Sequence, residues 1–512
     1  MPQALLLCNI FKSSYETGDI PAILKLATIV PIHKGGSRSE ASNFRPISLT
    51  SHIIKTFERV LRKTLVSYLE YNKKMDPKQH GSRAGRSTLS QLLEHQDAVP
   101  KALEDDENLD SIYLDFSKAF NKCDHGILLH KIKSLGIKGK IGRWIYSFLI
   151  GRLQEVLVKG HKSSKSPLKS GVPQGSVLGP ILFLIYVSDI GEDLVASVLV
   201  YVDDTKLTHK VKNEKDVEFV QDELKKLHQW GQKNNMEFNG NKFQVVRYGQ
   251  DVKLKEDTIY LSGDYEEVID QFSSLRDLGV QLTDDATFSE HIENICKKVR
   301  QKCGWLHRSF YTRNPNFMKH MFNSLIQPHI DYCSQLWMPQ EGQNLDKLEK
   351  LLRDFTRKMP GLKELNYWER LKKMKMSSEQ RRLERYQMIY IWKMMEDKVP
   401  NCGVAWSSDS ERKGRMCAVP ALRGRDSVKT LRTQSFQVSG PRLFNCLPKN
   451  IRNMTKCDLE KFKEKLDNFL SKVPDEPKTE TLIPGASRLY TERQSNSLLY
   501  QVARREGTWS WS

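Results

Sequence analysis

The segment 198–207 constrains the fold more than any other part of the chain, because two adjacent aspartates lie between apolar arms. Val198-Leu199-Val200 comes before Tyr201-Val202-Asp203-Asp204, and Leu207 follows. Apolar arms on either side of a short polar turn predict a β-hairpin that carries both carboxylates at its tight end. An ordinary Asp-Asp turn, which local side-chain hydrogen bonds favour, would give the same pattern.

Two neighbouring ionised carboxylates repel each other, and an apolar setting raises their pKa values unless a cation holds the charge. Mg²⁺, which takes one or two protein carboxylates together with substrate phosphates, suits such a turn. Asp115 adds a third carboxylate, since it lies in the apolar stretch Ile112-Tyr113-Leu114-Asp115-Phe116, where an unpaired charge is costly. With Asp203 and Asp204, it would complete a site for two metal ions ~4 Å apart, as used in phosphoryl transfer.

The length of 512 residues predicts more than one domain, and the pattern of apolar residues changes near residue 285. The first part mixes strands and helices, and the second part is dominated by basic amphipathic helices. The expected elements are strands at 23–32 and 111–116 and helices at 55–71, 291–308, 345–357 and 380–395. The last segment, 474–512, is expected to be poorly ordered, because it is rich in Pro, Ser and Thr.

The charge balance favours a polyanionic partner. Lys and Arg number 81 against 62 Asp and Glu, which gives a formal charge of +19. Basic residues bind nucleic acid by releasing its condensed counterions, although a basic surface that only keeps the protein soluble is the alternative. No stretch of about 18 apolar residues occurs, which excludes a membrane-spanning helix. Nine cysteines without metal-binding spacing favour reduced thiols and an intracellular protein.

Seven motifs follow one another in the order found in a known family. They are 31–36 (PIHKGG) with 43–49 (NFRPISL), 79–81 (QHG) with 85–87 (GRS), 114–120 (LDFSKAF), 171–180 (GVPQGSVLGP), 201–204 (YVDD), 239–242 (NGNK) and 278–280 (LGV). On these motifs the chain resembles the reverse transcriptases of non-LTR (LINE-type) retrotransposons, and most closely the Jockey-like group. The resemblance is strongest over 20–283 and continues more weakly to about residue 470.

The resemblance implies an α+β fold, a right-hand polymerase with fingers, a palm with an antiparallel sheet and a helical thumb. We therefore expect fingers and palm in 1–283, a helical thumb or connection in 284–400 and a basic, mostly helical C-terminal region in 401–473. Met1 falls inside the segment that normally precedes the fingers. The chain is therefore expected to be an N-terminally truncated fragment without an endonuclease.

The activity implied is RNA-directed DNA polymerisation, in which a primer 3′-hydroxyl attacks the α-phosphate of a deoxynucleoside triphosphate with two Mg²⁺ ions, or Mn²⁺, at the site. By resemblance, Asp115 and Asp203 hold the metals and Asp204 supports them. Lys34 and Arg45 are expected to contact the triphosphate. The implied partners are an RNA template, a DNA primer or target and deoxynucleotides, in a ribonucleoprotein of the nucleus or cytoplasm.

The resemblance also assigns roles to residues around the aspartates. Phe120 is expected to pack against the sugar and select deoxynucleotides, and otherwise reads as a core aromatic. Gln174 and Gly175 are expected to approach the nucleotide. Lys242 is expected to protonate the departing pyrophosphate. Tyr201, Leu278 and Gly279 complete the expected set as primer or template contacts.

Two other functions fit the same sequence. The first is a catalytically inactive nucleic-acid-binding remnant of such an element, and the second is an intron-maturase-like protein that uses a similar fold to bind RNA. The intact aspartates argue against the first alternative, and the C-terminal motifs, such as 332–337 (YCSQLW), argue against the second.

Overall fold

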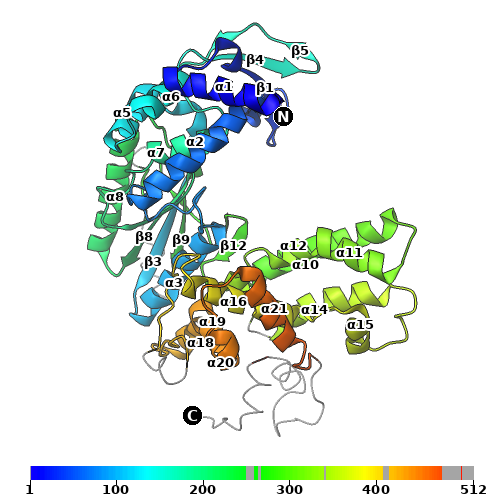
Figure 1. Cartoon of the computed structure of the whole chain (residues 1–512). Helices are drawn as coiled ribbons and strands as arrows, with labels where there is room; N and C mark the ends of the chain where they lie inside the picture. The colour runs from blue at the N-terminus through cyan, green and yellow to red at the C-terminus, as the bar shows by residue number, and fades with distance from the viewer. Residues whose placement is uncertain are drawn as a thin grey trace. The chain divides into compact units, whose positions relative to one another are not determined.

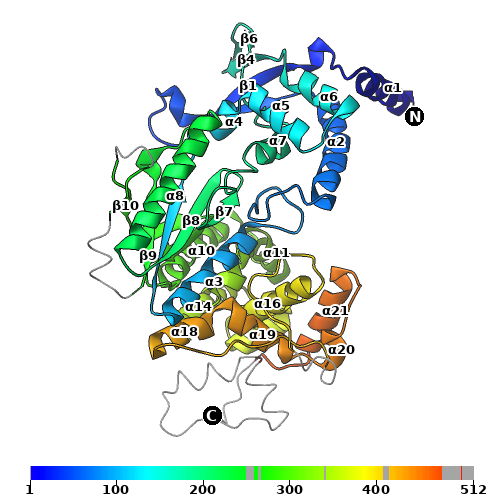
Figure 2. The same cartoon turned by 90° about the vertical axis from the view of Figure 1, so that its left-hand side faces the viewer.

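The chain divides into two compact units in a computed structural model that describes residues 2–249, 259–262, 267–339, 342–407, 414–475 and 498. The first unit comprises 1–84, 110–245 and 253–271, and the second comprises 85–109, 246–252 and 272–512. Figures 1 and 2 show helices packed around sheets in the first unit and a largely helical second unit. The expected boundaries of fingers, palm and thumb stay predictions. The expected disorder of 474–512 lies outside the described residues, apart from 474, 475 and 498.

A small sheet in the first unit has the order β2-β1-β4-β5, with β6 paired to β4. β1 (Leu26–His33) is antiparallel to β2 (Phe44–Leu49) and parallel to β4 (Leu153–Val158). β5 (His161–Lys162) and β6 (Ser166–Pro167) are both antiparallel to β4. The β1–β2 register places Ile32 opposite Arg45, so the start of the PIHKGG motif pairs with the NFRPISL motif.

A second sheet has the order β10-β9-β3-β8-β7 and carries the aspartate turn. The hairpin of β7 (Ser197–Tyr201) and β8 (Asp204–Val211) is antiparallel, so the hairpin predicted from the apolar arms is confirmed. β3 (Asn108–Leu114) lies between β8 and β9 (Gln244–Tyr248). The edge strand β10 (Asp270–Gln271) runs parallel to β9, so the expected antiparallel palm sheet carries a short parallel strand at its edge.

Helices of the first unit cover these sheets, and the amphipathic helix predicted at 55–71 is α2 (His52–Tyr71). Ser51 caps α2 by accepting a hydrogen bond from the backbone N–H of Ile53. Helix α7 is apolar on all its faces and is almost wholly buried, as expected for a helix without a polar face. The other helical bounds are α1 (Pro2–Thr17), α4 (Ala119–Lys122), α5 (His125–Ser134), α6 (Gly139–Leu149), α7 (Gly179–Tyr186) and α8 (Glu214–Lys233), with short 3-10 helices at Ala22–Leu24, Ala41–Asn43 and Gly240–Lys242.

The second unit combines α3 (Thr88–Glu104) with the helices that follow the β11–β12 hairpin (Ser274–Asp277 and Val280–Thr283). A buried ion pair of 2.8 Å joins Asp97 of α3 to Arg432 of α18. The helices predicted at 291–308, 345–357 and 380–395 are confirmed as α10, α14 and α16. The bounds are α10 (Ser289–Ser309), α11 (Pro315–Leu325), α12 (Gln327–Asp331), α13 (Ser334–Trp337), α14 (Gly342–Arg357), α15 (Tyr367–Met374), α16 (Glu379–Met395), α18 (Asp426–Gln434), α19 (Phe436–Asn445), α20 (Lys449–Arg452) and α21 (Leu459–Leu470).

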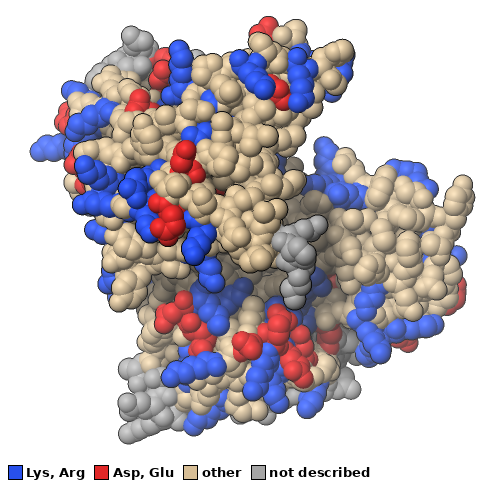
Figure 3. Space-filling view, turned by 45° about the horizontal axis from the view of Figure 1, so that its top comes forward, with Lys and Arg blue, Asp and Glu red and all other residues tan. Residues whose placement is uncertain are grey.

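The structure shows basic residues on the surface and free thiols, as the sequence predicts. Lys and Arg are spread over the face seen in Figure 3, and Asp and Glu gather in fewer places. All nine cysteines lie among the described residues, and each is a free thiol. Within the described ranges, no helix has the length and apolar character needed to cross a membrane.

Two carboxyl groups lie in the core of the second unit. Glu349 accepts hydrogen bonds from the Tyr367 hydroxyl (2.5 Å) and the backbone N–H of Gln380 (3.0 Å), and Glu379 accepts one from the Gln327 amide (3.1 Å). Burial raises the pKa of Glu349 to about 7. Burial, followed by the charge of Glu349, raises the pKa of Glu379 to about 8.

Glu379→Gln should flatten the pH dependence of stability. The folded carboxyl keeps a proton that the unfolded one, with its ordinary pKa of 4.5, releases, so the free energy of unfolding falls as pH rises from 4.5 to about 8. Gln does not titrate, so the variant should gain on the order of a few kcal/mol over the parent between about pH 5 and about pH 9. Urea unfolding measures this, with exposed Glu364→Gln as control; identical pH profiles of parent and Glu379→Gln would contradict the expectation.

Candidate active site

The turn between β7 and β8 consists of two residues, Val202 and Asp203, because Tyr201 pairs directly with Asp204. Val202 has φ of +62°, a left-handed conformation that costs a β-branched residue on the order of 1–3 kcal/mol. Such a turn persists only if the surrounding structure holds it. The strain is local to the residue that directly precedes the candidate ligand Asp203.

The side chain of Gln79 holds this turn. Its Oε1 accepts hydrogen bonds from the backbone N–H of Val202 (2.9 Å) and of Gly81 (2.7 Å), and the side chain is 4% exposed. The segment around it pairs with β7, since the N–H of His80 donates to the carbonyl of Val200 at 2.8 Å. A Cβ on Gly81 would stand 2.5 Å from Cγ2 of Val202, so only glycine allows this approach.

Asp115 lies one residue beyond β3, and its side chain is 34% exposed, so it is not the buried charge expected from the sequence. It also has a partner: Nζ of Lys242 lies 2.6 Å from its Oδ2. The backbone explains this pairing, because the N–H of Asn239 donates to the carbonyl of Asp115 and that of Lys242 to the carbonyl of Asn239, both at 2.9 Å. The NGNK motif is thereby fastened to the end of β3.

The surroundings of Asp203 make its carboxyl group harder to ionise. Burial raises its pKa, and the charge of Asp115 raises it further, while Arg45 and Lys34 act in the opposite direction. Asp115, Lys34 and Arg45 therefore all lie within electrostatic reach of Asp203. Lys34 and Arg45 are both exposed and come from the two paired strands of the small sheet, or directly follow them.

The expected metal site of three carboxylates stays a prediction. Asp204 begins β8 and is exposed. Asp203 lies in the turn, whereas Asp204 is the first residue of the strand that follows it. Among the described residues, no group of three or more His, Cys, Asp or Glu is arranged to hold a metal ion.

A divalent cation nevertheless fits the remaining pair. Asp115 and Asp203 repel each other, and the partly buried Asp203 carries a charge that its surroundings disfavour. Mg²⁺ needs only one or two protein carboxylates when substrate phosphates and water complete its shell. The donor set therefore suits a metal that arrives with a phosphate ligand.

The ring of Phe120 is held by its packing. It stacks on Phe183 of α7, with centroids 4.6 Å apart and planes 14° from parallel. Its carbonyl accepts a hydrogen bond from the N–H of Val172 (2.8 Å), the second residue of the GVPQGS loop. This packing gives the half-buried ring one orientation.

The loop that carries Gln174 and Gly175 is attached to β2. The N–H of Ser48 donates to the carbonyl of Gln174 at 2.7 Å. Gly175 has φ of +129°, and a Cβ there would lie 2.6 Å from the carbonyl oxygen of Ser48. Gly175 therefore permits a close approach of two backbones, and its contact in this structure is with the protein itself.

Glu58 fastens the other end of this loop and was not singled out in the sequence. Its buried carboxylate accepts hydrogen bonds from the N–H groups of Val177 (2.7 Å) and Leu178 (2.8 Å). Burial raises its pKa, while those N–H groups and Arg152 act against the rise. The available signal was its position on the apolar stripe of α2, next to Phe57 and before Leu61.

Leu278 and Gly279 form the turn between β11 and β12 in the second unit. The Tyr332 hydroxyl donates to the carbonyl of Leu278 at 2.7 Å, and a Cβ on Gly279 would lie 3.2 Å from the Tyr332 ring. This contact joins the LGV and YCSQLW motifs. Tyr201 ends β7 in the first unit, and a role in primer or template binding stays a prediction for all three residues.

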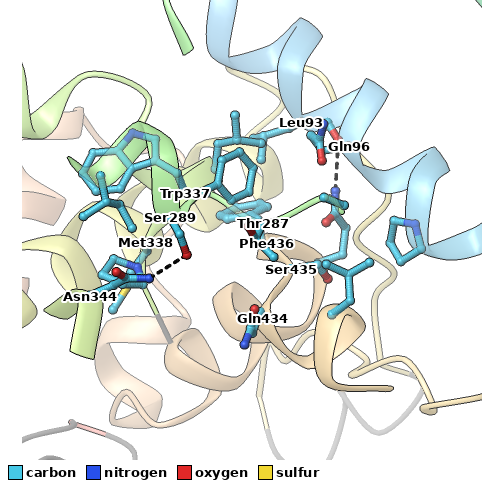
Figure 4. Close-up of a pocket in the computed structure, with 18 residues that line it drawn as sticks. Leu93, Gln96, Thr287, Ser289, Trp337, Met338, Asn344, Gln434, Ser435 and Phe436 are labelled. Carbon is cyan, nitrogen blue, oxygen red and sulfur yellow. Dashed lines mark hydrogen bonds between the residues drawn. The ribbon is translucent and has the colours of Figure 1, made fainter. Parts of the chain in front are cut away.

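A pocket of about 670 Å³ lies in the second unit (Figure 4). Its lining comes from α3, the start of α10 and the residues before it, the end of α13 and the residues after it, α14, and α18–α19, and includes Trp337, Phe436 and Gln96. Asn344 donates to the Ser289 hydroxyl at 3.0 Å across one side. No lining residue is acidic, basic, a histidine or a cysteine, so this pocket offers no group for acid–base or metal chemistry.

Comparisons with known proteins define the class. Residues 32–282 match the family model described as "Reverse transcriptase (RNA-dependent DNA polymerase)". This range includes Asp115 and Asp203 as well as Lys34 and Arg45. This region of the chain is a reverse transcriptase domain. The expected α+β fold class is thereby confirmed as that of a right-hand polymerase.

Within this family the chain is similar to polymerases of mobile elements. It is 29% identical over 370 residues to the RNA-directed DNA polymerase from mobile element jockey of Drosophila melanogaster, and 29% identical over 377 residues to the probable polymerase from transposon X-element of the same species. These alignments cover 69% and 70% of the chain but 40% of each relative. Among solved structures, apo telomerase from Candida tropicalis is similar with a TM-score of 0.41 at 12% identity, covering 78% of the chain and 67% of the telomerase.

Gln79→Leu should loosen the β7–β8 turn, because it leaves the N–H groups of Val202 and Gly81 without an acceptor at a local cost of ~1–3 kcal/mol. Hydrogen exchange of peptides covering 198–206 should become faster, while Gln79→Glu, which keeps a carboxylate acceptor, should retain most of the protection. The exposed Gln232→Leu serves as the matched control. Unchanged exchange in Gln79→Leu would show that the amide does not hold the turn.

Proposed function

We propose that this chain is an RNA-directed DNA polymerase whose reaction takes place at Asp115 and Asp203. The observation that carries the proposal is Asp203 within electrostatic reach of Asp115, Lys34 and Arg45, inside the region that matches the reverse transcriptase family. Carboxylates that bind a cation and cations that bind phosphate are the two groups that phosphoryl transfer requires. The chain spans 40% of the length of the jockey polymerase, so its own activity and partners belong to this proposal.

The proposed substrates are an RNA template, a DNA primer and deoxynucleoside triphosphates. The primer 3′-oxygen forms a bond to the α-phosphorus, the bond from that phosphorus to the bridging oxygen breaks, and pyrophosphate leaves. Arg45, with its planar fork, and Lys34 bind the triphosphate oxygens. Asp115 and Asp203 hold Mg²⁺, which when bound supplies the charge that lowers the pKa of the hydroxyl and steadies pyrophosphate.

Lys242 has two possible tasks in this reaction. Its Nζ lies 2.6 Å from Asp115 and is 60% exposed, so it is both paired and accessible. As an ammonium group it balances Asp115 before substrate binds. Once the carboxylate holds a cation, the same group is available to give its proton to the departing pyrophosphate, the role implied by the family resemblance.

Asp203→Asn should abolish primer extension on an RNA template. Asparagine has nearly the same shape and lacks the charge that binds Mg²⁺, so the rate should fall on the order of 1,000-fold. Incorporation of labelled deoxynucleotides at a fixed Mg²⁺ concentration measures it, with the exposed Glu218→Gln as control. If the folded parent chain binds RNA and extends no primer, the chain is an inactive remnant; if Asp203→Asn is as active as the parent, the site is elsewhere.

Phe120→Ala should relax the choice of sugar. The ring is held by its stack on Phe183, so removing it opens space where a 2′-hydroxyl would lie. Ribonucleotide incorporation, relative to deoxynucleotide incorporation, should rise roughly 10- to 100-fold, as for other steric discriminations of one small group. The ratio of kcat/KM values for the two nucleotides tests this. An unchanged ratio would show that Phe120 is a core aromatic without a role in sugar selection.

A further inference from the structure

The helical hairpin of α10 and α11 is a surface of one charge sign. Residues 294–330 contain seven Lys or Arg and no Asp or Glu, although Asp and Glu supply 62 of the 512 residues overall. Figure 3 shows the part built from α10 to α15 at the right, with blue among tan and little red. Surfaces of one sign this long create a field that draws a polyanion.

One face of α10 collects this charge. Ile292, Val299 and Leu306 are buried on the inner face. The outer face carries exposed residues at helical spacing, namely Lys297, Lys298, Gln301, Trp305 and Arg308.

Like charges on this face are close together. The charges of Lys298 and Lys302 both lower the pKa of His329, after burial, so these three groups share one region. Two lysines four residues apart on a helix destabilise it unless an anion intervenes. Among the described residues, neither lysine forms an ion pair, which leaves the charge of both available to an external anion.

Two aromatic side chains stand out of the same surface. Trp305 is 50% exposed, and Tyr311, just after α10, is fully exposed. Trp305 is oriented by an edge-on contact with Phe310, whose ring in turn meets Phe317 edge-on at 5.3 Å. Single exposed aromatics are common, but a fixed indole among uncompensated lysines is suited to stacking against a flat anionic ligand.

We propose that the outer face of α10, continued by Tyr311, binds single-stranded RNA through base stacking on Trp305 and Tyr311. Lys297, Lys298 and Arg308 pair with phosphates on either side of the stacked bases. A paired helix hides the faces of its bases, so stacking requires an unpaired segment. The surface chemistry stands by itself, and the choice of RNA over DNA rests on the proposed function, whose template is single-stranded RNA.

The experiment compares binding of the full chain to a fluorescent single-stranded oligoadenylate RNA, the same sequence as DNA, and an RNA duplex, without nucleotides. A Trp305→Ala, Tyr311→Ala double variant should bind the single-stranded RNA ~10- to 100-fold more weakly, with an unchanged salt dependence and unchanged duplex binding. A Lys297→Gln, Lys298→Gln variant should instead reduce the slope of log affinity against log salt by about 1.4. Tyr71→Ala and Tyr146→Ala, exposed aromatics of the first unit, are the matched controls.

Equal binding of single-stranded RNA by the aromatic variant and the parent would overturn the proposal, as would an equal loss of duplex binding. An equal loss of single-stranded DNA binding would overturn the assignment to RNA. Because no step of this assay needs polymerisation, an inactive parent chain whose RNA binding depends on Trp305 and Tyr311 would reject the proposed function and keep this inference. An active parent chain whose RNA binding is unchanged in the aromatic variant would support the proposed function and reject this inference.

Discussion

The hydrogen bonds from Val202 and Gly81 to one buried amide oxygen of Gln79 are the constraint on which the candidate active site depends. A two-residue turn with a β-branched residue at positive φ is unfavourable in isolation, so its geometry must be imposed from outside the hairpin. Gln79 does this from a segment that already pairs with β7. Asp203 therefore takes its position from a contact between residues 123 apart in sequence.

Buried polar groups fix the other half of the site in the same way. Glu58 holds two N–H groups at the end of the GVPQGS loop, and Ser48 holds the carbonyl of Gln174 near its middle. Apolar packing alone would allow this loop to slide, because dispersion contacts have little directional preference. Directed hydrogen bonds to backbone groups give the loop one register against β2 and α2, and Phe183 then gives Phe120 one orientation.

Local patterns in the sequence predicted the elements, and distant contacts escaped them. Apolar spacing was enough for α2, α10, α14, α16 and the β7–β8 hairpin, since each buries one face or two arms. The same reasoning placed Asp115 inside a strand, whereas pairing with the NGNK segment ends β3 one residue earlier and supplies Lys242 as a partner. Spacing also could not separate Asp203 from Asp204, because which of two neighbours falls in a turn depends on the register of the hairpin.

Two pairs of carboxyl groups, one pair in each unit, lie in different surroundings. In the first unit, Lys34 and Arg45 act on Asp203 and Lys242 pairs with Asp115, so three cations accompany two carboxylates at a site that is partly open. In the second unit, Glu349 and Glu379 are buried and their raised pKa values favour the neutral acid. Protonated carboxyls in the core cannot neutralise lysines on the surface, so the hairpin of α10 and α11 retains its full charge for an external anion.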